Sequence, residues 1–146
     1  METQLNTNPS TKIVKLDFKD SKYATGRRKR SIAKVWLKKG SGIIHVNGKK
    51  MIDYFKKQNL QIAISRPFTL TQRENIFDVR CSVRGGGLSG QAGAIIHGIS
   101  RAILSYEPEL KSTLKKEKLT TRDSRVVERK KPGRKKARKS FQFSKR

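Results

Sequence analysis

The sequence IFDVRCSVRGGGLSGQAGAIIHGISRAI, Ile76–Ile103, contains two different hydrophobic periodicities. Residues 76–84 alternate apolar and polar side chains, which is typical of a β-strand with one buried face. From Ala92 to Ile103 the apolar residues recur at spacings of three and four, which indicates a helix with one buried side. We therefore predict a strand followed by a helix that packs on it, with Ser89 as the helix N-cap. Cys81 falls on the apolar side of the strand and is predicted to be a small core residue.

A run of three glycines, residues 85–87, joins this strand to this helix, and Gly90 completes a GxGxxG pattern. A dinucleotide-binding unit would continue into a second parallel strand that ends in an acidic residue. Here the helix is followed instead by Glu107-Pro108-Glu109. The segment also departs from the P-loop and from the GxSxG nucleophile pattern. We identify no catalytic residues and predict that the protein is not an enzyme.

Gly90 and two further glycines, Gly93 and Gly98, fall inside or near the predicted helix. Each costs up to about 1 kcal/mol relative to alanine in a helix. Close approach of another backbone justifies such a cost, and the neighbour is either the strand beneath or a phosphate outside. For the turn itself we predict that Gly87→Val damages folding or subunit assembly, because valine restricts φ and adds bulk where the backbone must approach closely.

The remaining elements follow from shorter patterns. Ser31–Lys39 alternates and is predicted to form a β-hairpin over residues 31–47, with Asn47-Gly48 supplying a turn of positive φ. Trp36 lies on the lysine side of this strand, where we interpret it as a cover of the domain rim; RNA base stacking is the less favoured alternative. We predict a helical turn over 51–57, a second helical piece that ends before Pro67, and a further helix from Pro108 through residue 114.

The charge of the chain indicates a polyanionic partner. Lys and Arg number 36 against 11 acidic residues, a net charge of +25 that internal ion pairs cannot neutralise. Nucleic acid is the commonest such partner. An anionic membrane is the weaker alternative, because there is no run of about 18 apolar residues. A single cysteine excludes an internal disulfide, and His45 and His97 stand apart from any acidic or cysteine cluster, so we predict no metal site and no cofactor.

The C-terminal segment RDSRVVERKKPGRKKARKSFQFSKR, residues 122–146, holds twelve cations and two acids. Its few apolar residues cannot form a core. Fully extended, the segment spans roughly 80 Å at about 3.3 Å per residue. A solvated free tail is one interpretation of such a run. We favour a nucleic-acid-binding tail, since the run is rich in arginine, carries two aromatic residues and belongs to an already basic chain.

Several long motifs identify the chain as similar to one family. Residues 85–94 and His97-Gly98-Ile99-Ser100-Arg101-Ala102 resemble the signature of the ninth protein of the small ribosomal subunit, in its bacterial and organellar form. So do residues 119–131, LTTRDSRVVERKK, and the ending QFSKR. YATGRRK at 23–29 and VNGK at 46–49 match the start of that family. The resemblance runs from about Tyr23 to Arg146, and Pro132 with the residues after it departs slightly while keeping the charge.

The resemblance implies an α+β fold, a β-sheet with helices packed on one face, shared with the second domain of small-subunit protein five and with some small-molecule kinases. Together with the polar composition of the N-terminus, which has no counterpart in the family, it divides the chain into a mobile N-terminal extension (1–22), a globular RNA-binding domain (23–119) and an extended basic tail (120–146). It implies a structural role in the head of the small subunit, on ribosomal RNA and beside other head proteins, with the tail tip at the peptidyl-site transfer RNA. No membrane and no small-molecule substrate are expected.

The expected location is the cytoplasm, on a bacterial-type ribosome, with the mitochondrial matrix as the alternative. Two other functions stay open at this stage: a phosphate-binding, kinase-like domain, and a basic nucleic-acid-binding protein outside the ribosome. The residues expected to bind ribosomal RNA are Arg27, Arg28, Lys29, Arg30, Arg84, Gly85, Gly86, Gly87, Gln91, Arg122, Arg125, Arg129, Lys130, Lys131, Arg134, Lys135, Lys136, Arg138 and Lys139. The residues expected to bind transfer RNA are Ser144, Lys145 and Arg146.

Overall fold

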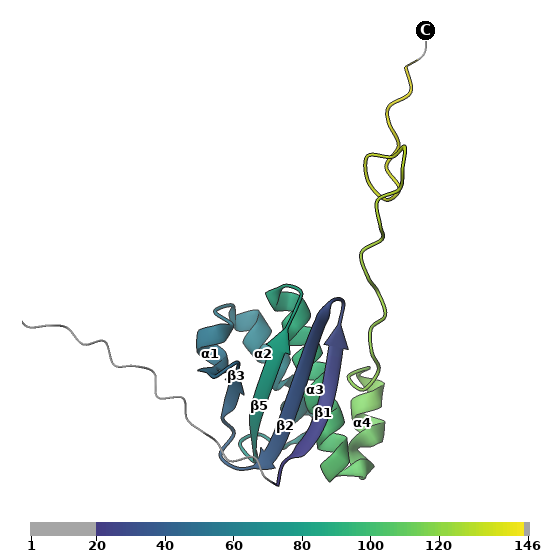
Figure 1. Ribbon diagram of the computed structural model, residues 1–146. Coiled ribbons are helices and arrows are strands. Elements are labelled where there is room, and N and C mark those ends of the chain that lie inside the picture. The colour runs from purple at the N-terminus through teal and green to yellow at the C-terminus, as the bar shows by residue number, and fades with distance from the viewer. Residues whose placement is uncertain (1–19, 145–146) are drawn as a thin grey trace, which may run out of the picture.

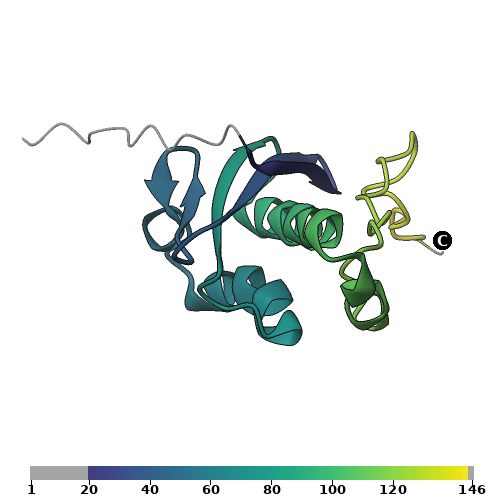
Figure 2. The ribbon, with the colours of Figure 1, turned by 90° about the horizontal axis from the view of Figure 1, so that it is seen from below.

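Helices cover one face of a β-sheet whose other face lies open (Figures 1 and 2). The computed structural model describes residues 20–144, so most of the predicted N-terminal extension lies outside the described residues. In this part of the chain the sheet has five strands in the order β1-β2-β5-β3-β4, and only β3 and β5 run parallel. The strands are β1 (Lys22–Arg28), β2 (Ser31–Lys39), β3 (Ile44–Val46), β4 (Lys49–Lys50) and β5 (Phe77–Arg84). The helices are α1 (Met51–Tyr54), α2 (Gln58–Thr71), α3 (Leu88–Tyr106), the short 3-10 helix η1 (Pro108–Leu110) and α4 (Lys111–Lys116). The predicted α+β class with helices on one face is confirmed.

The core lies between the sheet and α3, as the two periodicities of residues 76–103 predicted. Every second residue of β5 is buried, from Phe77 to Val83. The buried side of α3 includes Ile95, Ile99 and Ile103, all fully buried. Cys81 is a buried core residue, and burial raises the pKa of its thiol. It therefore stays a neutral apolar side chain.

The predicted hairpin over residues 31–47 is wrong. Strand β3 pairs in parallel with β5, and β2 lies between β1 and β5. The loop after β2 crosses the end of β5 because β5 offers it partners: the Gly40 N–H donates to the Ile76 carbonyl at 2.8 Å, and Asp78 Oδ1 accepts the N–H groups of Ser41 and Ile43 at 2.8 and 2.9 Å. The Asn47-Gly48 turn does have positive φ at both residues, 50° and 81°, but it joins β3 to β4.

Two predicted helix boundaries are also wrong. Helix α2 continues through Pro67 and ends at Thr71, and the C-cap residue Gln72 has a left-handed φ of 53°. Pro67 and Phe68 are buried in the core, so the packing of this turn outweighs the lost backbone hydrogen bond. Helix α3 begins two residues earlier than predicted, with Gly87 rather than Ser89 at the N-cap position.

Strand β1, which the periodicity did not predict, packs against α3 through glycine. A Cβ placed on Gly26 would lie 1.9 Å from the Ala94 carbonyl oxygen and 2.4 Å from the Gly98 nitrogen. A Cβ on Gly98 would lie 2.5 Å from Val35 Cγ2. Of the two explanations for the glycines of this helix, close approach of the strand beneath is the one that the structure supports at Gly98.

Candidate nucleic-acid interface

The tail leaves the domain beside α3, and His97 fixes the point of departure. His97 Nδ1 accepts the backbone N–H of Arg27 at 3.3 Å, so its Nε2 carries the proton and donates to the Thr120 carbonyl at 3.2 Å. One neutral imidazole thus links β1, α3 and the first tail residue. Burial is the main cause that lowers the pKa of His97, and the nearby cations of Arg101 and Arg122 lower it further.

Asp123 forms a second attachment of the tail to the domain. Its carboxylate pairs with Arg28 on β1 and with Arg125 in the tail, the latter at 2.8 Å. Asp123 Oδ1 also accepts the backbone N–H of Arg125 at 2.9 Å, which folds the chain locally. The side chains of Arg28 and Asp123 are 26% and 27% exposed, so these pairs contribute modest stability. Their effect is to hold residues 120–125 against the domain, which sets the direction in which the rest of the tail leaves (Figure 1).

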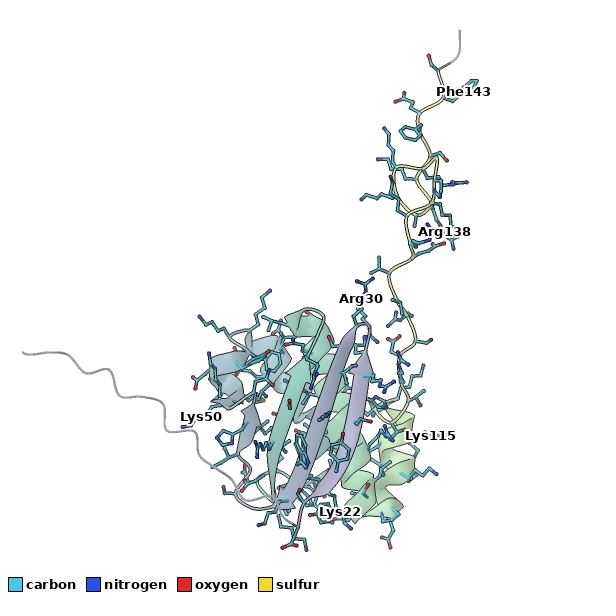
Figure 3. The ribbon with its side chains drawn as sticks, in the orientation of Figure 1. Lys22, Arg30, Lys50, Lys115, Arg138 and Phe143 are labelled. Atoms are coloured by element: carbon cyan, nitrogen blue, oxygen red, sulfur yellow. The ribbon has the colours of Figure 1, made fainter. Side chains whose placement is uncertain are left out.

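A groove of about 750 Å³ opens where the tail leaves the domain, and we call it the root groove. It is lined by β1, α3, the end of α4 and the first tail residues. Lys115 at this position is visible in Figure 3. The cations that line the root groove are Arg27, Arg28, Lys115, Lys118, Arg122 and Arg125, and Asp123 is the one carboxylate among its described lining residues.

A second groove of about 840 Å³, the turn groove, lies between the β1–β2 turn, the glycine turn and the next part of the tail. Lys29 and Arg30 form the tip of the β1–β2 turn, beside tail residues 126–129 (Figure 3). Across the groove α3 begins, and the first N–H groups of a helix have no partner within the helix. Glu128 and Arg129 on the tail side offset each other, so Lys29, Arg30 and the helix N–H groups give the groove its positive potential.

The glycine turn is shaped by its packing on β2. Gly85 and Gly86 have φ of 77° and 65°, and a Cβ on either would lie within 2.5 Å of Arg30 or Ser31 atoms. A Cβ on Gly87, in contrast, meets no described atom within 4 Å, and its φ is −104°. The close backbone approach that we predicted at Gly87 is therefore wrong, and the need for glycine in folding falls on Gly85 and Gly86. An effect of Gly87→Val on subunit assembly stays a prediction.

The tail beyond residue 126 is exposed and carries its cations outward. It is extended except for a compact loop in which the Lys135 N–H donates to the Lys139 carbonyl at 2.9 Å. Glu128 bridges to Lys131 and to Arg138 at 3.0 and 2.9 Å, and these side chains lower the pKa of its carboxyl. The aromatic Phe143 is 87% exposed near the end of the described chain (Figure 3).

The structure gathers the predicted RNA-binding residues into sets. Those of β1 and residues 122–125 line the root groove, and Lys29, Arg30, Gly86, Gly87 and Arg129 line the turn groove. Gln91 is engaged within the fold, because its Oε1 accepts the Tyr54 hydroxyl at 2.8 Å. Arg84 lies at the end of β5 on the open face, and Lys130–Lys139 lie farther along the tail. Of the predicted transfer-RNA residues, Ser144 is exposed, while Lys145 and Arg146 lie outside the described residues.

Sequence reasoning missed Lys115 and Lys118 in the root groove, and it missed the attachments made by His97 and Asp123. The two lysines carry no signal that separates them from other surface lysines. Asp123 does carry one, because an acid two residues before an arginine inside a basic run is suited to a local side-chain to backbone bond.

We expect stability to depend on pH through His97. Since its folded pKa is lowered, the unfolded chain binds the proton more readily. The stability is therefore fully present above the ordinary histidine pKa of about 6.5 and falls as the pH drops below it. His97→Gln keeps an acceptor and a donor but removes the titration. Measured from pH 7 to 5, the free energy of unfolding should fall more steeply for the parent than for this variant. Parallel pH profiles would contradict the prediction.

The described residues contain no cluster of three or more His, Cys, Asp or Glu that could hold a metal ion. In the same residues no helix is long and apolar enough to cross a membrane. A positively charged groove on each side of the β1–β2 turn, and a cationic tail held at its root, define a protein built to bind a polyanion. The chain belongs to the Ribosomal protein S9/S16 family, whose model matches residues 26–146. It is thus a structural protein of the small ribosomal subunit, associated with the ribosome and bound to ribosomal RNA.

Proposed function

We propose that the root groove, the turn groove and the tail hold ribosomal RNA in the head of the small subunit, beside neighbouring head proteins, and that the tail tip contacts the peptidyl-site transfer RNA. The residues that carry ribosomal RNA binding are those named from the sequence, with Lys115 and Lys118 added. Ser144, Lys145 and Arg146 carry the transfer-RNA contact. The expected setting is a bacterial-type ribosome in the cytoplasm, with a mitochondrial ribosome as the alternative.

The observation that supports this proposal most is the way the tail is attached. His97 and Asp123 hold residues 120–125 against the domain, and beyond them the chain leaves the domain with its cations exposed. A tail that served only solubility would need no such attachment. Because the fold fixes the position of the start of the tail, the tip of the tail can reach only a limited region of the surrounding RNA.

The side-chain chemistry fits phosphate. Arginine presents a planar fork of donors that binds phosphate oxygens in pairs, while lysine acts as a compact charge. The root groove combines four arginines with two lysines. A duplex or folded RNA presents rows of phosphates, and neutralising them releases condensed counterions, which favours binding.

The kinase-like alternative has less support. A kinase would use the glycine turn to cradle a nucleotide phosphate, but Gly85 and Gly86 are required by packing against Arg30 and Ser31. A basic protein outside the ribosome accounts for the charge, but membership of a ribosomal protein family favours the ribosome.

The tip is tested by removing Ser144, Lys145 and Arg146 from the otherwise complete chain. Ser144 is exposed, none of the three residues adds an apolar side chain, and ten of the twelve tail cations remain, so we expect normal folding and incorporation into small subunits. Transfer RNA should bind the peptidyl site several-fold more weakly, since a hydrogen bond to a charged group contributes about 1.5 to 3 kcal/mol when buried and less when screened.

The control is the full-length chain with Lys111→Gln and Lys116→Gln, which removes two charges from α4. Transfer-RNA affinity for programmed subunits is compared at fixed magnesium and salt. If truncated, control and parent subunits bind equally and maintain the reading frame equally, the tip does not touch transfer RNA and the tail serves only as an RNA anchor.

A further inference from the structure

The face of the sheet opposite the helices is uncovered by any described element, and Figure 1 looks directly onto it. Alternate residues of each strand point to this face because their neighbours point into the core. On β2 these residues are Ile32, Lys34, Trp36 and Lys38, and on β5 they are Asp78, Arg80, Ser82 and Arg84. This surface is separate from the root groove and the turn groove, apart from Arg27 at its edge.

An aromatic pair lies on this face, on the edge strand β1 and its neighbour β2. Tyr23 on β1 stands opposite Trp36 on β2 in the antiparallel register, and the two ring centroids are 5.4 Å apart at an interplanar angle of 44°. The same row continues to Arg80 on β5 and His45 on β3. Tyr23 is 49% exposed. Two adjacent rings offer a broader stacking surface than the single tryptophan seen in the sequence.

Cations surround this aromatic pair. Lys34 lies two residues from Trp36 on the same strand, Arg80 is the cross-strand neighbour of Trp36, and Arg84 and Arg27 continue toward one end. Among the described residues of the two central strands, Asp78 is the one carboxylate on this face. Its Oδ1 is occupied by the N–H groups of Ser41 and Ile43. The face is therefore positive around the exposed Tyr23 ring and the half-buried Trp36 ring.

We propose that the open face of the sheet is a second RNA-binding surface, on which bases of a single-stranded RNA segment stack on Tyr23 and Trp36 while Lys34 and Arg80 contact the flanking phosphates. A protein partner would need an apolar or acidic surface, whereas aromatic rings framed by cations are the arrangement that binds single-stranded nucleic acid. This inference rests on the proposed function only in that the chain lies on RNA. It assigns a different surface and a different mode of contact.

Trp36 makes the test direct, because it is the only tryptophan of the chain. The full-length protein is titrated with a short oligoadenylate while Trp36 fluorescence and the anisotropy of a label on the RNA are recorded together. Stacking of a base on the indole should quench the fluorescence in a saturable way. An abasic oligomer of the same length supplies phosphates without bases, and it should bind by anisotropy but leave Trp36 unquenched.

Variants separate this face from the tail. Tyr23→Leu should weaken the binding that quenches Trp36 by about tenfold, the loss expected from part of one stacking contact. Lys34→Gln should weaken it several-fold, while Lys111→Gln, which removes one lysine from α4, should not. Lys34→Gln changes an exposed side chain, so it tests the face even if Tyr23→Leu disturbs β1.

Each outcome is informative. A variant with glutamine in place of three tail cations, Arg129, Lys130 and Lys131, should bind RNA with lower total affinity by anisotropy. It should still show saturable quenching of Trp36 fluorescence. RNA that binds by anisotropy without quenching Trp36, or an abasic oligomer that quenches equally, would overturn the inference and leave the proposed function standing. Absence of binding in the anisotropy channel would overturn both.

Discussion

Replacing Gly26 by alanine is expected to lower the free energy of unfolding by about 3 kcal/mol or more, the largest effect of any single methyl group that we predict. The new Cβ would lie 1.9 Å from the Ala94 carbonyl oxygen and 2.4 Å from the Gly98 nitrogen. Both atoms are backbone, so no rotamer change relieves the overlap. β1 and α3 must move apart, which opens the core along their contact.

The same change should also disturb the interface. β1 carries Arg27, whose N–H reaches His97, and Arg28, which pairs with Asp123. Movement of β1 away from α3 therefore loosens both attachments of the tail. We expect more rapid proteolysis within residues 120–125 in Gly26→Ala than in the parent.

Thermal unfolding measures the stability effect, and the melting temperature should fall on the order of 10 to 25 °C. Gly87→Ala is the matched control: a Cβ there meets no described atom within 4 Å, and the residue has an ordinary negative φ. Alanine at that position should change the free energy of unfolding by less than about 1 kcal/mol. If Gly26→Ala and Gly87→Ala have the same melting temperature, Gly26 is not required for close packing of β1 on α3.

Much of the fold could be predicted where an element buries its own periodic apolar residues. β2, β5 and α3 each do so, and each was found. β1 was not predicted because its inward positions include Ala24, Gly26 and Arg28, which are too small or too charged to give a hydrophobic alternation. Its position follows from the fit of Gly26 against α3, a contact between segments far apart in the sequence.

Other errors came from local rules that tertiary contacts outweigh. A loop of the length found after β2 suits a hairpin, but Asp78 draws it across the end of β5. Proline normally ends a helix, but Pro67 is buried within α2. The composition predicted the polyanionic partner because the net charge of a chain follows from its sequence alone. It did not show which cations share a groove, since the root groove joins Arg27 of β1 to Lys115 of α4 and Arg122 of the tail, which lie far apart in the sequence.

The second large effect is expected from the tail. A tail variant in which six cations are replaced by glutamine should bind small-subunit ribosomal RNA more weakly, on the order of a thousandfold near physiological salt. The replaced residues are Arg129, Lys130, Lys131, Arg134, Lys135 and Lys136. The reason is that each lost phosphate contact removes a release of counterions. All six residues are exposed and lie outside the core, so the melting temperature of the isolated chain should stay close to that of the parent.

A control with the same net charge separates the tail from general electrostatics. It carries Gln at six exposed lysines of the domain: Lys39, Lys49, Lys56, Lys57, Lys111 and Lys116. If RNA is attracted only by the total charge of the chain, the two variants should lose equal affinity. If the tail is the anchor, the domain variant should lose much less.

The most direct test is the salt dependence of binding to small-subunit ribosomal RNA, measured for the parent and both variants over a series of salt concentrations. The logarithm of the affinity should fall steeply with the logarithm of salt for the parent. It should fall less steeply, by about four to five in slope, for the tail variant, since each contact contributes about 0.7 to 0.9. The domain variant should keep most of the parent slope. Equal slopes for the parent and the tail variant would contradict the account, because the tail would then not be what binds the RNA.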